Sequence, residues 1–173
     1  MEFVDIYTAR RELTGRTTLR GTPLDEGEYR LVVHAALFNK QGELLIQQRQ
    51  PFKKGWSGLW DLTVGGAVTA GETSEIAVMR ELQEELGLVW DTREMAPCLS
   101  ITFAHGFDDI YLLRGEVNTE DLQLQYEEVA QVKWATQEEV RQMLRDEMFV
   151  PYHESLIDLL FAMHKQLGGL RVV

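Results

Sequence analysis

Three glutamates near the middle of the chain are of the right type and spacing to bind a metal ion. Glu81, Glu84 and Glu85 stand at positions i, i+3 and i+4, so in a helix their carboxylates share one face. Like charges at this spacing destabilise a helix by about 0.2–0.5 kcal/mol per pair, and Arg80 is the only basic residue of the segment 73–86. A divalent cation would remove the repulsion. A solvated acidic face is the alternative interpretation.

The element that carries these glutamates is predicted to be a helix over about residues 73–86. Thr73 or Ser74 can cap its start, and Gly87 suits the left-handed position that ends a helix. Apolar residues recur at spacings of three and four, namely Ile76, Met79, Leu82 and Leu86. At about 100° per residue this stripe lies roughly opposite the glutamates, so we expect one buried apolar face and one acidic face.

The residues around the helix complete a longer pattern. Gly66, which lets the backbone approach a ligand closely, is followed by five residues and Glu72. Seven residues later comes the string Arg80-Glu81-Leu82-Gln83-Glu84-Glu85-Leu86-Gly87-Leu88. Residues 66–88 resemble the Nudix box at every defining position. The resemblance extends over roughly residues 30–135, and it includes Arg49, the segment 56–60 and Trp134.

The resemblance implies a fold and a reaction. The expected fold is of the α/β (α+β) class, a Nudix-type α/β/α sandwich around a mixed β-sheet. The expected reaction is hydrolysis of a diphosphate linkage in a nucleoside diphosphate derivative. By the family's pattern Glu84 and Glu85 are the principal metal ligands, Glu81 is a further ligand or the general base, and Gly66 offers its backbone carbonyl to the metal.

Glu72, Arg80 and Gly87 are the structural residues of the box in the same resemblance. We expect Glu72 and Arg80 to pair and to hold the loop against the helix. The expected cofactor is Mg²⁺, with Mn²⁺ as a substitute, because Mg²⁺ favours carboxylate and water oxygens and usually bridges protein to substrate phosphates. Such a metal neutralises phosphoryl oxygens and lowers the pKa of a bound water, whose proton a nearby unliganded carboxylate accepts.

Residues outside the box are weaker candidates. An extra ligand or base can come from Glu116, Glu127 or Glu128, and contacts to substrate phosphates from Arg49, Lys53 or Lys54. Ordinary solvated surface is the alternative for both sets. His34 lies in an apolar strand and is expected to be a packed core histidine. Aromatic residues that can stack on a base, or simply fill the core, are Trp56, Trp60, Phe103, His105 and Phe107.

The rest of the chain is expected to form a single domain over residues 1–173. Residues 1–28 are an N-terminal extension, with segments 3–7 and 12–16 forming a hairpin, and residues 137–173 carry the C-terminal helices, near 137–147 and 153–167. The remaining predicted strands are 29–38, 44–46, 59–64, 98–104, 109–117 and 129–134, with Gly65-Gly66 breaking the third of these and a loop at 104–108.

Charge and cysteine content limit the partners and the compartment. A net charge of −11 provides no field that attracts a nucleic acid polymer, whereas a small diphosphate can bind through a metal ion. Cys98 is the single cysteine, so no intrachain disulfide can form. The start of the sequence lacks a signal-peptide pattern and no window suits a membrane span, so a cytoplasmic location is expected. A homodimer is left open.

Three other functions share parts of this pattern. The segment around 30–66 also resembles isopentenyl-diphosphate isomerase. However, Gly65 and Ala67 stand where the isomerase has its catalytic cysteine and a metal-binding histidine, and Arg30 aligns with another family histidine. A non-catalytic ligand sensor of the same fold would have lost box glutamates, and this chain has lost none. Messenger-RNA decapping would need a basic path for RNA. The group attached to the diphosphate is not specified by the box.

Overall fold

The computed structural model of the chain describes residues 2–170, so residues 1 and 171–173 of the expected domain lie outside the described residues. Its strands are β1 (Phe3–Tyr7), β2 (Leu13–Leu19), β3 (Arg30–Phe38), β4 (Leu44–Arg49), β5 (Trp60–Asp61), β6 (Val64–Ala67), β7 (Leu99–Phe103), β8 (Gly106–Arg114) and β9 (Val129–Ala135). Its α-helices are α1 (Ser74–Leu86), α2 (Gln137–Arg145) and α3 (Glu154–Lys165), with a 3₁₀ turn at Thr119–Asp121.

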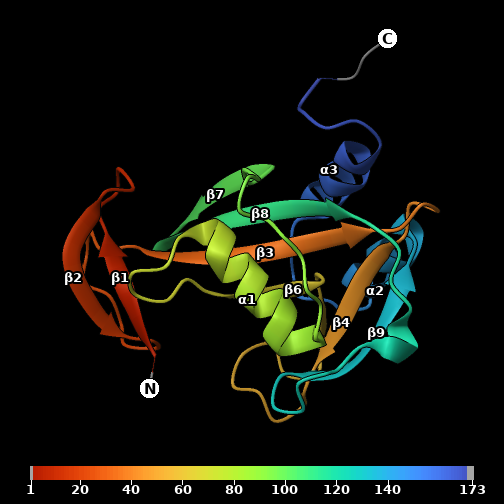
Figure 1. Cartoon of the computed structure of the whole chain (residues 1–173), viewed down its shortest axis with the longest axis horizontal. Helices are drawn as coiled ribbons and strands as arrows, with labels where there is room; N and C mark the ends of the chain where they lie inside the picture. Colours follow the sequence, from red (N-terminus) through yellow and green to blue (C-terminus); the bar gives the residue numbers. More distant parts are fainter. Residues whose placement is uncertain (1, 171–173) are drawn as a thin grey trace.

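Seven strands form one mixed sheet with the order β5-β4-β3-β8-β7, to which β6 adds by pairing with β3 and β9 by pairing with β4 (Figure 1). The long strands β3 and β8 run parallel, and the other strand pairs of this sheet are antiparallel. The expected mixed sheet is therefore confirmed.

The two faces of β3 are buried against different helices, because alternate side chains of a strand point to opposite faces. Leu31, Val33, Ala35 and Leu37 pack in one cluster with the apolar residues of α1. Ala36 and Phe38 pack in a second cluster with residues of α2 and α3. Figure 1 shows α1 across one face of the sheet and α2 and α3 away from it. The α/β/α layering predicted for the sheet is confirmed.

One edge of β3 is shared by two strands, and this sharing positions the box. β6 pairs with β3 from Val32 to Ala35, whereas β4 meets β3 at the far end, where Phe38 lies opposite Leu44. β6 and β4 therefore pair with the same edge of β3, but at different positions along it. Residues of both strands can then approach α1, which packs over this part of the sheet.

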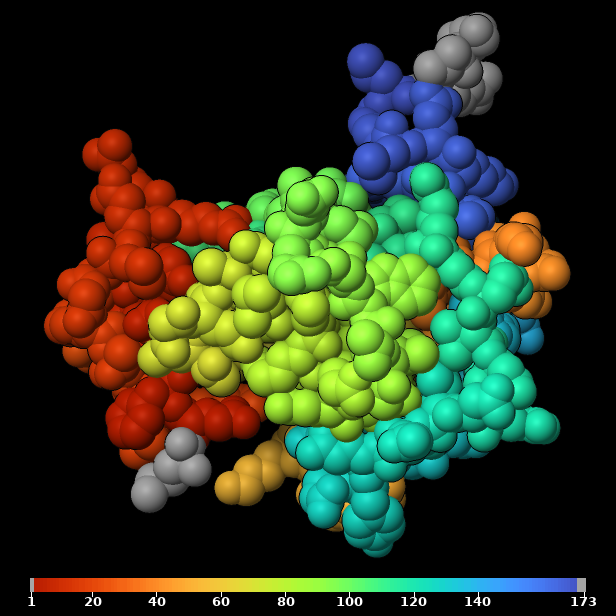
Figure 2. All heavy atoms as spheres, viewed as in Figure 1, coloured from red at the N-terminus to blue at the C-terminus, as the bar shows by residue number. Residues whose placement is uncertain are grey.

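The predicted N-terminal hairpin is present as β1 and β2, and two of its attachments to the rest of the chain position it beside the box. Tyr7 forms a bridge with Tyr29 just before β3. The loop before α1 is the second attachment, where Gly71 N donates to Asp5 Oδ2 at 2.7 Å. Figure 2 shows the hairpin, in red, in contact with the yellow segment that leads into α1. The hairpin therefore lies beside the loop that precedes the box helix α1.

Several predicted boundaries are wrong, and three of them concern the site. Gly65 and Gly66 do not break a strand but lie inside β6, because their missing side chains leave room for neighbours on both faces. The single strand expected at 59–64 is two short strands, which pair with β4 and β3 respectively. β8 begins at Gly106 and ends at Arg114, so Glu116 follows the strand instead of lying on it.

Membrane-spanning helices are absent from residues 2–170, since none of the helices there combines the length and apolar character that a span requires.

Candidate active site

Helix α1 begins and ends close to the predicted residues. Thr73 occupies the N-cap position without a side-chain cap bond, and the Ser74 hydroxyl instead bonds to the Tyr111 hydroxyl at 2.6 Å. Gly87 adopts the left-handed conformation, with φ of 69°, and its N–H bonds to the carbonyl of Gln83. The helix is therefore fixed at its start by a contact to β8 and at its end by a glycine.

The prediction of an acidic face opposite an apolar stripe is wrong for this helix. The buried residues of α1 are Ser74, Ala77, Val78, Glu81, Leu82, Glu85 and Leu86. Ile76, expected in the apolar stripe, is exposed, whereas the whole residues Glu81 and Glu85 are only 6% and 3% exposed. Both carboxylates thus lie along the edge of the packed face, turned toward the sheet, and Glu84 alone projects into solvent.

Glu81 is accommodated by the glycine that begins the box. A Cβ atom built on Gly66 would overlap the Glu81 carboxylate, so no larger residue fits here without movement. Burial raises the pKa of Glu81, although the neighbouring charge of Arg80 opposes the rise. The absent side chain of Gly66 therefore creates the space in which a carboxylate is held against the backbone of β6.

Glu85 is the most strongly perturbed carboxylate of the site. Burial and then the charge of Glu81 raise its pKa to about 8, even though Gln47 Nε2 donates a hydrogen bond to Glu85 Oε2 at 2.9 Å. The other amide atom, Gln47 Oε1, is buried without a hydrogen-bond partner. Among residues 2–170, Glu85 therefore has no basic partner, and an unpartnered amide oxygen lies beside it.

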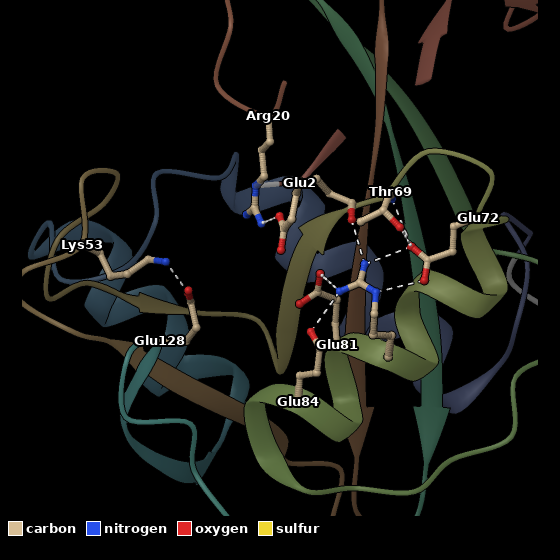
Figure 3. Close-up of polar contacts among 10 residues, drawn as sticks. Glu2, Arg20, Lys53, Thr69, Glu72, Glu81, Glu84 and Glu128 are labelled. Atoms are coloured by element: carbon tan, nitrogen blue, oxygen red, sulfur yellow. Dashed lines mark hydrogen bonds and ion pairs between the residues drawn. The ribbon is translucent and has the colours of Figure 1, made fainter. Parts of the chain in front are cut away.

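Arg80 connects the helix to the loop before it, and Figure 3 labels its carboxylate partners Glu72, Glu81 and Glu84. Its Nε and Nη2 donate to the two oxygens of Glu72 at 2.9 and 3.0 Å, and Nη2 also donates to the carbonyl of Ala67 at 3.0 Å. The pairing expected of Glu72 and Arg80 is therefore present. Nη1 of Arg80 donates to Glu81 at 2.8 Å and to Glu84 at 3.1 Å.

The three box glutamates are not gathered around one point in this arrangement. Among residues 2–170, no three His, Cys, Asp or Glu side chains are close enough to hold a metal ion together. Arg80 Nη1 pairs with both Glu81 and Glu84, whereas Glu85 is bonded to Gln47. The donor set nevertheless fits a hard divalent cation, because buried carboxylates with raised pKa values gain most from added positive charge.

The candidates outside the box are distributed unevenly. Glu128 pairs with Lys53 and contributes to the raised pKa of Glu85, so both residues lie near the box. Glu116 accepts a bond from the backbone N of Lys40 at 2.7 Å, in the turn between β3 and β4. Glu127 and Lys54 are exposed.

Arg49 lies at the end of β4 and is oriented by two neighbours. Its Nε donates to the carbonyl of Gly55 at 3.1 Å, and its Nη1 is 3.7 Å from Asp61 Oδ2. The alternative of ordinary solvated surface is therefore wrong for Arg49, since its side chain is only 18% exposed and lies beside the buried Asp61 carboxylate. Asp61 itself lies opposite Gln47 in the pairing of β5 with β4.

His34 is not simply packed in the core, which corrects the prediction. Its Nδ1 is 2.8 Å from Asp108 Oδ1, and its Nε2 is 3.3 Å from the hydroxyl of Tyr152, which donates to Asp61 Oδ1 at 2.8 Å. Burial by itself lowers the pKa of His34, but the hydrogen bond and charge of Asp108 outweigh it and raise this pKa to about 9. A chain of polar groups thus crosses the face of the sheet opposite α1.

Two clefts meet at His34 and Val32. The smaller, about 310 Å³, lies between the hairpin and the strands β3 and β6, and Gly66 is part of its lining. The larger, about 840 Å³, includes the exposed aromatic residues Trp56 and Phe103. Trp60 and Phe107 are buried and belong to the core. The sequence had grouped them with Trp56 and Phe103 as residues that could stack on a base or fill the core.

Sequence reasoning missed Gln47, Asp61, Asp108, Tyr152 and Arg20 as residues of this region. Gln47 gave a weak signal, as a polar residue directly after the apolar run Leu44-Leu45-Ile46. The others gave none, because their proximity depends on strand pairing and on the position of the hairpin.

Comparison with known proteins identifies the family. The model of the NUDIX domain matches residues 28–160. The uncharacterised Nudix hydrolase lmo0368 of Listeria monocytogenes is 44% identical over 152 residues, which cover 88% of this chain and 90% of the relative. The crystal structure of DR0079 from Deinococcus radiodurans is 28% identical with a TM-score of 0.73, covering 92% of this chain and 97% of that one.

A relative with another name shares a smaller part of the sequence. The isopentenyl-diphosphate Delta-isomerase of Salmonella typhi is 32% identical over 115 residues, 62% of each chain. The isomerase similarity is weaker and shorter than the others, whereas the family model and the Listeria relative extend over most of the chain. The chain therefore belongs to the Nudix family and is a Nudix hydrolase, acting on diphosphate-containing substrates in the general sense of that family.

Proposed function

We propose that the chain uses Mg²⁺, or Mn²⁺ in its place, to hydrolyse the diphosphate linkage of a nucleoside diphosphate derivative. The observation that carries the proposal is the burial of two box carboxylates, Glu81 and Glu85, beside Gly66. Leaving two like charges with little water is costly unless positive charge is added. A divalent ion that binds a diphosphate provides that charge.

The residues proposed to hold the metal are Glu81, Glu84 and Glu85, with the backbone carbonyl of Gly66. A bound divalent ion would neutralise phosphoryl oxygens and make a bound water more acidic. Glu84, which is exposed and bonded only to Arg80, can turn toward the other two by side-chain rotation. Arg80 meanwhile stays fixed by its two bonds to Glu72, so the loop that carries Gly66 keeps its position relative to α1.

The reaction needs a base for the attacking water. Water adds to one phosphorus, the bridging P–O bond breaks, and the water's proton passes to a carboxylate while the leaving phosphate takes the bonding electrons. Glu81 and Glu128 are the candidates supported by position, since Glu128 contributes to the electrostatic field at Glu85. Glu116 is less suitable, because it is engaged by the turn between β3 and β4.

The larger cleft supports an organic group with a planar ring. Trp56 and Phe103 are 54% and 37% exposed and line it, and aromatic faces of this kind stack on nucleobases. Trp56 also has a positive φ of 50°, a strained conformation for a bulky residue that is often found at ligand sites. Asp108 and His34 in the same cleft offer hydrogen-bonding groups for a base edge.

An isomerase-like reaction is the alternative function, favoured by the isomerase-named relative. It needs a proton donor and acceptor at carbon, and Gly65 and Ala67 stand at the positions of the isomerase's cysteine and histidine. Cys98 packs against the buried cluster on the other face, and burial raises its pKa to about 11, so it is a poor proton donor. These features support hydrolysis over isomerisation.

The acidic charge and single cysteine support a small-molecule substrate, no nucleic acid polymer and a cytoplasmic location. The test is a panel of nucleoside diphosphate derivatives, dinucleoside polyphosphates, sugar nucleotides and isoprenoid diphosphates, with Mg²⁺, Mn²⁺ or EDTA and ³¹P NMR of the products. We expect metal-dependent cleavage of at least one nucleotide compound, and at least 100-fold slower turnover in Glu85→Gln. Equal rates with EDTA, or an undiminished rate in Glu85→Gln, would remove the box from the mechanism.

A further inference from the structure

The smaller cleft has a charge unlike that of the chain as a whole. The net charge of the chain is −11, yet the cleft is lined by Arg20 and Arg30 together with His34, Gly65 and Gly66. In the described part of the chain, no Asp or Glu lines it. The cleft is therefore a local cationic region directly beside the glycine of the box.

Arg30 is a half-buried guanidinium whose donors are free. It begins β3, where its backbone bonds to His105, but its side chain makes no hydrogen bond or ion pair to any residue of 2–170. A guanidinium carries five N–H donors in a planar fork that suits phosphate oxygens. A free, partly buried fork of this kind is a ready site for an anion.

Arg20 reaches the same cleft from the hairpin. Its Nη1 bonds to Glu2 at 2.7 Å, which leaves its other donors available. It also lies within electrostatic range of Glu81 and Glu128, so it faces the box and not only its own hairpin. Figure 3 shows the Arg20–Glu2 pair between the Lys53–Glu128 pair and the box residues Glu72, Glu81 and Glu84.

We propose that Arg20 and Arg30 bind phosphate oxygens of the substrate in this cleft, so that the N-terminal hairpin is part of the substrate site. The ligand class is a diphosphate or a longer phosphate chain that extends from the box past Gly66. The cleft volume of about 310 Å³ lies at the small end of the range for ligand sites and is sufficient for a phosphate chain. This proposal rests on the proposed function for the identity of the substrate, although the anion site can be tested without turnover.

The test is calorimetric titration of methylenediphosphonate, a diphosphate that cannot be hydrolysed at its bridge, into wild type, Arg20→Ala and Arg30→Ala in EDTA at low salt. A charge-assisted hydrogen bond lost from such a site weakens binding by about tenfold or more, which we expect for each variant. Arg10→Ala is the matched control, since Arg10 is an exposed residue of the same hairpin region and does not line the cleft. We expect it to stay within about twofold of wild type.

The proposal is overturned if wild type does not bind the diphosphonate, if both arginine variants bind it like wild type, or if Arg10→Ala loses as much. Arg20 lies at the exposed end of the hairpin, so Arg20→Ala decides the matter if Arg30→Ala proves unstable. Arginine-dependent binding without hydrolysis of any compound would contradict the proposed function alone. Hydrolysis with KM unchanged in both arginine variants would contradict the anion site alone.

Discussion

Replacing Glu85 by glutamine is expected to stabilise the metal-free protein while abolishing its activity. Glu85 is only 3% exposed, and its pKa is raised from 4.5 to about 8. The folded chain therefore binds a proton at Glu85 that the unfolded chain has lost between pH 4.5 and pH 8. In this window the free energy of unfolding of wild type falls as the pH rises.

The magnitude follows from the width of that window. Each pH unit between the two pKa values is worth about 1.4 kcal/mol, so by pH 7 the burial of Glu85 has cost the wild type on the order of 3 kcal/mol. A glutamine has no such dependence, and its new NH₂ group can donate to Gln47 Oε1, which is buried without a partner. We expect Glu85→Gln to melt on the order of 10 °C above wild type at pH 7 in EDTA.

The assay is thermal unfolding of both proteins in EDTA from pH 5 to pH 8. The difference between them should be small at pH 5 and should grow toward pH 8. Glu84→Gln is the matched control, because Glu84 is a neighbouring box glutamate whose side chain is 49% exposed. A Glu85→Gln protein that is less stable than wild type at pH 8, or a difference that does not change with pH, would refute the reasoning.

Three further outcomes are expected. Mg²⁺ at about 100 times its Kd should stabilise wild type by about 2.7 kcal/mol. This stabilisation should be smaller in Glu85→Gln, should persist in Arg80→Ala, and should exceed the effect of monovalent salt at matched ionic strength. Equal shifts with metal and with salt would point to screening alone. Gly66→Ala should lower both stability and turnover, because its Cβ would overlap the Glu81 carboxylate. Gly55→Ala is the control and should change neither, since open space surrounds Gly55. Wild-type behaviour of Gly66→Ala would contradict the close contact. Purified protein with Mg²⁺ should not interconvert isopentenyl and dimethylallyl diphosphate, and detecting that reaction at a catalytic rate would reverse the choice of reaction class.

The hairpin shows what a local pattern can and cannot predict. Segments 3–7 and 12–16 were sufficient to predict two paired strands, because alternation and turn residues act over a few residues. They did not indicate that Arg20 would lie beside Gly66. That placement depends on contacts between distant segments, such as the bond from Gly71 to Asp5.

The helix, predicted over about residues 73–86 and found at Ser74–Leu86, its left-handed end at Gly87 and the family of the box could all be predicted from the sequence, because spacing along one helix is a local property. Which glutamates are buried depends on the packing of distant segments. Helical periodicity placed Glu81 and Glu85 on a solvent face, but the neighbouring strands extend over them, and the missing side chain of Gly66 leaves the space that Glu81 fills. Burial of a helix residue depends on which segments pack against it. Here those segments are strands about 15 to 40 residues earlier in the sequence.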